Sequence, residues 1–164
     1  MKTKNLVTTA IAVMLIIVGT QLKISIGLIP ITLQFFVITL LALKLKPSEM
    51  ISAMLIFILG STLGLFPIAG GLSGPMILLA PSFSFIIGFL VYSSILSRYK
   101  SIKAIVIAYL IFYLVALTFL QINLRFLLDT KLSIYTTISL YFLPFVITDI
   151  ITITIAYQIS KRIK

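Results

Sequence analysis

Long runs of uncharged residues are the feature that most constrains this chain. Residues 50–97 contain 48 consecutive residues without a charge, and residues 5–22, 24–43 and 104–120 form further uncharged runs. A helix needs about 20 apolar residues to cross the hydrocarbon core of a bilayer. Only 10% of the residues are charged, against about 25% in a soluble domain. The sequence therefore predicts an integral membrane protein, with residues 1–164 forming one domain.

The charges and prolines divide the chain into six predicted membrane-spanning helices, which makes the fold an all-α bundle. The expected helices cover residues 5–22, 30–43, 48–65, 82–97, 104–120 and 144–161, the second beginning near Pro30 and the last near Pro144. With the N-terminus inside, ten of the 13 Lys and Arg residues fall in inner segments, and Lys23, Arg125 and Lys131 fall in outer ones. The positive-inside rule then predicts that both termini are cytoplasmic.

The residue types exclude several classes of chemistry. The chain has no Cys and no His, and its three acids, Glu49, Asp129 and Asp149, are scattered along the sequence. We therefore expect no metal site, no cofactor and no catalytic carboxylate pair, and we do not expect an enzyme. A P-loop motif is also absent from the sequence, so active transport would need ATPase partners. The basic residues lie in short clusters between apolar runs, which argues against nucleic-acid binding.

Residues 66–89, FPIAGGLSGPMILLAPSFSFIIGF, combine an uncharged composition with six helix breakers, among them Gly70, Gly71 and Pro81. Irregular backbone at membrane depth is tolerated only where it is buried in protein or lines a cavity. We therefore expect this segment to form an outer loop that folds over the bundle, where glycines allow the backbone to approach a ligand. The alternative is a tight connection that is merely shielded from lipid.

The sequence contains IPITLQ (29–34), LGLFPIAGG (63–71), LLAPSFSFIIGF (78–89) and LPFVITDIIT (143–152), and these four patches resemble motifs of the BioY family, the substrate-binding S components of energy-coupling-factor (ECF) vitamin transporters. IPITLQ (29–34) is similar to the family's VPITLQ, and LGLFPIAGG (63–71) to its GLPVFAGG. LLAPSFSFIIGF (78–89) stands in the place of its LLGPTGGYLLGF, and LPFVITDIIT (143–152) in the place of its PFLPGDLLK. Order, spacing and total length agree, so the resemblance covers essentially the whole chain.

The resemblance implies a multi-pass subunit in a bacterial plasma membrane that binds biotin with a six-helix fold of S-component type. It also implies a transmembrane coupling subunit and two ABC-type ATPase subunits as partners. Two departures from the family bear on the ligand: Phe83 and Ser84 replace glycines, where any φ above zero would be strained, and Thr152 replaces a lysine. There are two alternatives: an S component for another small vitamin, and a structural membrane protein without a ligand.

Asp149 is the strongest candidate site residue, because it is an acid well inside a predicted span, where a charge is costly. It would accept hydrogen bonds from two N–H donors such as those of the biotin ureido ring, with Thr152 adding a hydroxyl on the same helix face. The alternative is a charge that only stabilises a helix N-terminus. Gln34 offers two donors and an acceptor, although an interhelical hydrogen bond would also explain it.

Aromatic residues of the outer half provide candidate walls for an apolar pocket, although ordinary core or lipid contacts would explain them equally well. One of the outer cations Lys23, Arg125 and Lys131 would pair with a ligand carboxylate in place of the missing lysine; the alternative is that they only contact solvent or lipid head groups. The complete set of expected substrate-binding residues is Gln34, Phe66, Gly70, Gly71, Pro81, Phe83, Phe85, Asp149 and Thr152.

Overall fold

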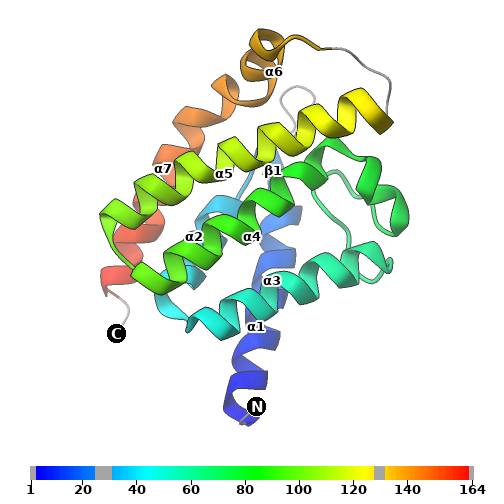
Figure 1. Ribbon diagram of the computed structural model, residues 1–164. Coiled ribbons are helices and arrows are strands. Elements are labelled where there is room, and N and C mark those ends of the chain that lie inside the picture. Colours follow the sequence, from blue (N-terminus) through cyan, green and yellow to red (C-terminus); the bar gives the residue numbers. More distant parts are fainter. Residues whose placement is uncertain (1–2, 25–30, 128–131, 163–164) are drawn as a thin grey trace.

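A computed structural model describes residues 3–24, 31–127 and 132–162 and shows a helical bundle (Figure 1). Pro30, Lys131 and the terminal lysines Lys2 and Lys164 lie outside the described residues. The helices of the described part are α1 (Thr3–Gln21), α2 (Gln34–Lys44), α3 (Pro47–Thr62), α4 (Pro81–Tyr99), α5 (Ile102–Ile122), α6 (Ile134–Tyr141) and α7 (Leu143–Arg162). Two short irregular helices, η1 (Pro75–Leu79) and η2 (Asn123–Leu127), follow the long loop and α5.

In the described part of the chain, four helical segments are long and apolar enough to cross a membrane: α1, α4, α5 together with most of η2, and α7. The predicted bounds of α1, α3, α4, α5 and α7 agree with the structure to within a few residues. However, α2 has 11 residues and α3 has 16, which span roughly 16 Å and 24 Å. The prediction of six full-length spans is therefore supported for four helices in the described part of the chain.

The second helix begins at Gln34 and not near Pro30 as expected. Residues just before it form a short antiparallel hairpin, in which β1 (Lys23–Ile24) pairs with β2 (Ile31–Thr32). In this pairing Lys23 lies opposite Thr32. The strand pairing satisfies backbone groups that a longer helix would have satisfied internally, and it fixes where α2 starts.

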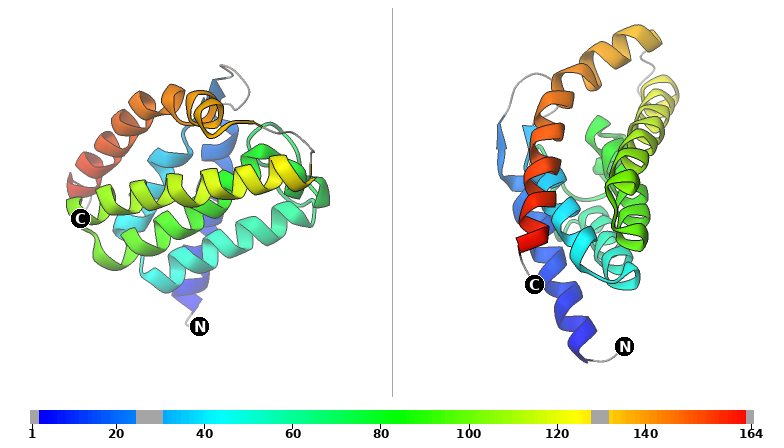
Figure 2. Two further views of the ribbon diagram at one scale, coloured as in Figure 1. Left: turned by 45° about the horizontal axis from the view of Figure 1, so that its top comes forward. Right: turned by 90° about the vertical axis from the view of Figure 1, so that its left-hand side faces the viewer.

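The long helices form two layers, which the right-hand view of Figure 2 shows edge-on. One layer contains α1, α2 and α7, with α2 packed along α7, and the other contains α3, α4 and α5, with α4 packed along α5. Between the layers lies a core of fully buried side chains that includes Ile16, Ile38, Phe57, Tyr92 and Phe112. The α2–α3 and α4–α5 turns meet at one end, where Lys100 Nζ donates to Lys44 O at 3.5 Å.

Candidate functional site

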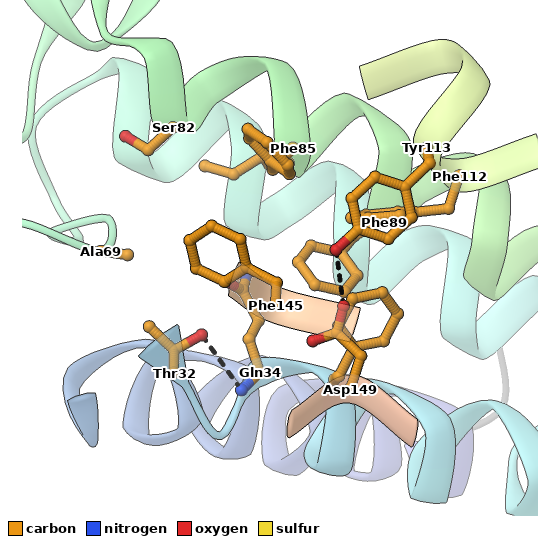
Figure 3. A pocket seen from close by; sticks show the side chains of 12 residues that line it. Thr32, Gln34, Ala69, Ser82, Phe85, Phe89, Phe112, Tyr113, Phe145 and Asp149 are labelled. Atoms are coloured by element: carbon orange, nitrogen blue, oxygen red, sulfur yellow. Dashed lines mark hydrogen bonds between the residues drawn. The ribbon is translucent and has the colours of Figure 1, made fainter. Parts of the chain in front are cut away.

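A cavity of about 50 Å³ lies between the two layers, toward the end of the bundle that carries the hairpin and the long loop (Figure 3). Its walls come from β2, α2, the loop, α4, α5 and α7. The lining residues are Thr32, Gln34, Phe35, Ala69, Ser82, Phe85, Ile86, Phe89, Phe112, Tyr113, Phe145 and Asp149.

Asp149 is the charged group of this cavity. It lies in the second turn of α7, and only 7% of its surface is exposed. The Tyr113 hydroxyl donates to Asp149 Oδ2 at 2.6 Å, and the Tyr109 hydroxyl approaches the same oxygen at 3.4 Å. Both tyrosines belong to α5, so these bonds connect the two layers across the cavity. Within the described residues Oδ1 accepts no hydrogen bond, which leaves it available to a donor inside the cavity.

Gln34 is the second polar group in the wall, and it is 4% exposed. As the first residue of α2 it donates its backbone N–H to Thr32 Oγ1 at 3.3 Å. Its side-chain Nε2 is buried and has no hydrogen-bond partner among the described residues. A buried donor without a partner costs about 1–3 kcal/mol, so an acceptor within the cavity would relieve this cost.

Aromatic rings form most of the remaining wall. The Phe35 ring packs edge-on against Phe89 and Phe112, with centroids 4.6 Å and 4.7 Å apart. Phe85 packs near Phe112 and Tyr113 at 6.1 Å and 6.4 Å. Such edge-to-face packing holds each ring in a defined orientation. The cavity therefore combines a rigid apolar wall with one carboxylate and one amide.

The loop between α3 and η1 contributes Ala69 to the cavity, as Figure 3 shows. Its neighbour Ile68 is fully buried, and Gly71 N donates to Ile68 O at 2.9 Å to close a tight turn. The Gln21 side chain ties the loop to α1 by donating to Pro67 O at 3.0 Å. The expectation of a loop folded over the bundle is therefore met by the structure.

The glycines of this turn are required for a different reason from the one expected. Gly70 and Gly71 have φ of +105° and +85°, and no atom lies within 4 Å of the position of an added Cβ at either residue. Neither residue is in the wall of the cavity. Backbone conformation, and not a close approach to a neighbour, explains why glycine occupies them.

Three of the nine expected site residues meet in the cavity: Gln34, Phe85 and Asp149. Phe66 instead packs on Gly60 and lines a separate groove between α1 and α3. Thr152 points into a groove on another face of α7 and donates its hydroxyl to Thr148 O and Asp149 O at 2.9 Å and 3.0 Å. The shared helix face expected for Asp149 and Thr152 is therefore not observed.

Pro81 and Phe83 flank the cavity without lining it. Pro81 is the first residue of α4, and Phe83 packs against the hydrophobic core. The segment in which any positive φ would be strained is the helical first turn of α4, so Phe83 and Ser84 adopt no positive φ. The loss of the family's glycines there consequently imposes no backbone strain.

Tyr109 and Tyr113 were missed by the sequence reasoning. Both lie in the uncharged run 104–120, where nothing distinguished them from other aromatic residues. Their spacing of four residues places them on one face of α5. The sequence did contain a signal for their role. Two tyrosines lie at positions i and i+4 of a predicted span, in a chain that has an intramembrane acid without an obvious partner.

Comparisons with known proteins identify the family to which the chain is similar. The family model described as "BioY family" matches residues 1–164. The biotin transporter BioY2 of Lactococcus lactis subsp. cremoris (strain MG1363) is 32% identical, over 92% of this chain and 84% of its own length. The probable biotin transporter BioY of Pyrococcus horikoshii is 31% identical, over 100% of this chain and 98% of its own.

A solved structure is also similar along nearly the whole chain. It is a crystal structure of the S-component for biotin from an ECF-type ABC transporter, with a TM-score of 0.72 and 26% sequence identity, and the match covers 98% of this chain and 90% of that one. The full-length family match, the two relatives above 30% identity and the shared fold lead to one conclusion: this chain belongs to the BioY family.

Proposed function

We propose that this protein is the membrane-embedded biotin-binding subunit of an ECF-type vitamin uptake transporter and is not an enzyme. The observation that carries the proposal is the pairing, in one apolar cavity, of an unpartnered amide donor on Gln34 with a carboxylate oxygen of Asp149. The names of the relatives and of the solved S-component support the choice of biotin.

The chemistry of the two polar groups matches a cyclic urea. A ureido ring presents one carbonyl acceptor flanked by N–H donors. Gln34 Nε2 would donate to the carbonyl, and Asp149 Oδ1 would accept from an N–H, while Phe35, Phe85 and Phe112 would enclose the apolar ring. Each polar group of the pair would then be satisfied, which a ligand without both a donor and an acceptor would not achieve.

The cavity must widen when the ligand enters, because about 50 Å³ holds a few water molecules and not a vitamin. The loop that carries Ala69 is the element best suited to move, since in the described part of the chain its hydrogen bonds to α1 come from one side chain, that of Gln21, which donates to Pro67 O and Ile68 O. We infer that this loop opens the site and closes over bound biotin.

For the membrane orientation and the partner subunits we propose what the sequence led us to expect. We place both termini, the α2–α3 turn and the α4–α5 turn in the cytoplasm of a bacterial cell, because their basic residues obey the positive-inside rule. The shorter α2 and α3 then complete six membrane-embedded helices of a single domain, residues 1–164. Energy would come from a transmembrane coupling subunit and two ABC-type ATPase subunits, which fits the likeness to an S-component of an ECF-type ABC transporter.

The test uses Gln34→Leu, with binding and stability measured together by titration calorimetry and thermal unfolding of the purified protein. We expect a biotin affinity about 2- to 13-fold lower, which corresponds to a neutral hydrogen bond. The Tm should stay the same or rise, because an unsatisfied buried donor is removed. Gln121→Leu, which removes a hydrogen bond to Thr137 away from the cavity, is the control and should leave affinity unchanged.

The opposite pattern, a lower Tm with unchanged affinity, would show that Gln34 has only a structural role. Mass spectrometry of small molecules that co-purify with the wild-type protein decides the identity of the ligand. Recovery of a different vitamin, with no binding of biotin, would replace biotin by that vitamin, and the absence of any ligand would favour a structural membrane protein.

A further inference from the structure

The acidic end of biotin has no charge partner in the cavity. Biotin carries a carboxylate on a short alkyl chain, whereas the described lining of the cavity contains an acid, Asp149, and no Lys or Arg. A carboxylate buried beside another carboxylate, without a cation, is strongly disfavoured. Given the function proposed above, the alkyl chain must therefore carry the carboxylate out of the cavity toward a positive charge.

A groove of about 420 Å³ adjoins the cavity between the hairpin and α7. Its lining residues are Leu22, Lys23, Thr32, Leu33, Thr148, Ile151 and Thr152. Thr32 lines both this groove and the cavity, and Figure 3 shows it at the edge of the cavity beside Gln34. The two spaces are therefore neighbours that share the Thr32 side chain as part of their boundary.

The hairpin register brings a cation to this boundary. Lys23 is paired directly with Thr32 across the two strands. Residues directly opposite in an antiparallel pair point to the same face, with Cβ atoms about 4.5–5.5 Å apart. The Lys23 side chain is exposed and lines the groove, so its ammonium group is free to follow a ligand tail that passes Thr32.

The other described cations are less suitable. Arg125 lies exposed on η2 and lines neither the cavity nor the groove. The basic residues of the α2–α3 and α4–α5 turns and of the end of α7 lie at the other end of the bundle, where Lys100 and Lys44 meet. Lys4 lies in the first turn of α1, near the N-terminus and remote from the hairpin.

We propose that Lys23 binds the carboxylate of the ligand in the groove between the hairpin and α7, with Thr32 marking where the tail leaves the cavity. Thr152 lines this same groove, at the position where the resemblance led us to expect a lysine. The positive charge has thus moved from α7 to β1 across one groove, and Lys23 determines the preference for an acid over a neutral ligand.

The experiment compares biotin with biotinamide, which keeps the bicyclic ring and replaces the carboxylate by a neutral amide. Affinities are measured by titration calorimetry on the full-length protein in detergent. The wild type should bind biotin more tightly than biotinamide. Lys23→Met should weaken biotin binding about two- to fivefold, the loss expected for an exposed charge pair, and should leave biotinamide binding unchanged.

Three further variants sharpen the test. Arg125→Met is the matched control, since it removes the other described outer cation, and it should preserve the preference for biotin. Lys23→Arg should preserve it as well. Adding Thr152→Lys to Lys23→Met should restore the preference, because the new lysine enters the same groove.

The proposal is overturned if Lys23→Met retains the wild-type ratio of biotin to biotinamide affinity, or if Arg125→Met abolishes that ratio. A wild-type protein that binds biotin and biotinamide equally would also overturn it while leaving the proposed function intact. A wild type that binds neither compound refutes the proposed function and this inference with it.

Discussion

Asp149→Asn replaces the carboxylate of the cavity by an amide of nearly the same shape. In the wild type, Asp149 Oδ2 accepts from Tyr113 at 2.6 Å and from Tyr109 at 3.4 Å, and Oδ1 is left for the ligand. An asparagine has a single side-chain oxygen, and the short bond from Tyr113 would retain it. The group that faces the ligand then becomes an NH₂ donor, which opposes an N–H donor of the ureido ring.

The magnitude follows from the two kinds of bond that change. The ligand loses a hydrogen bond to a charged acceptor, worth about 1.5–3 kcal/mol, which corresponds to about 10- to 150-fold in affinity. Folding loses less, because the tyrosine bond is kept in neutral form and a buried charge is removed at the same time. We therefore expect the Tm to fall by no more than about 2–4 °C.

Titration calorimetry with biotin and thermal unfolding of the same sample measure both effects. Glu49→Gln is a matched control, because Glu49 is also 7% exposed and its Oε2 accepts only the backbone N–H of Lys46, at 3.0 Å, among the described residues. That variant should bind biotin normally. Wild-type affinity in Asp149→Asn would refute the role of the carboxylate and leave a charge that merely stabilises the start of α7.

Three other predictions concern the loop, the start of α4 and the topology. Gly71→Val places a β-branched residue at φ +85°. We therefore expect a distorted loop and a loss of biotin binding, in a protein that still inserts into the membrane and purifies in a folded state. Unchanged binding would show that the loop does not form the site. Phe83→Gly with Ser84→Gly should lower the Tm without raising biotin affinity. Both residues are helical, and each glycine in a helix lowers the free energy of unfolding by about 0.5–1 kcal/mol. A rise in biotin affinity would contradict this expectation. A reporter active only outside the cell should be silent when fused after Lys164 and active when inserted near Leu72, and the reverse pattern would overturn the topology.

Much of the fold could be read from the charges and breakers of the sequence. A charge is expensive inside a bilayer, so charged residues mark where spans end, and the predicted bounds of α1, α3, α4, α5 and α7 follow from this rule. Asp149 stood out for the same reason. The hairpin and α6 were missed: β1 and β2 have two residues each and depend on each other for pairing, and α6 has only eight residues.

The composition of the site could be predicted only in part. Gln34 and Asp149 were found because polar groups are conspicuous in an apolar run, and Phe85 because it lies within the broken segment. Phe66 and Thr152 lie near the site in sequence but point into other grooves. Tyr113 was indistinguishable from its neighbours until α5 was placed against α7.

The sequence alone was enough to predict that the chain enters a membrane as helices, because lipid offers no hydrogen bonds to the backbone. For the same reason it was enough to predict that one acid and one amide would be costly to bury there. The face of each helix that lines the cavity became known only from the packed bundle. In α5, Phe112 is buried while Leu110 and Leu114 are exposed to the surroundings, although all three are apolar. Lipid and bundle interior are equally apolar, so hydrophobicity does not mark the inner face of a helix, and its rotation is set by packing against its neighbours.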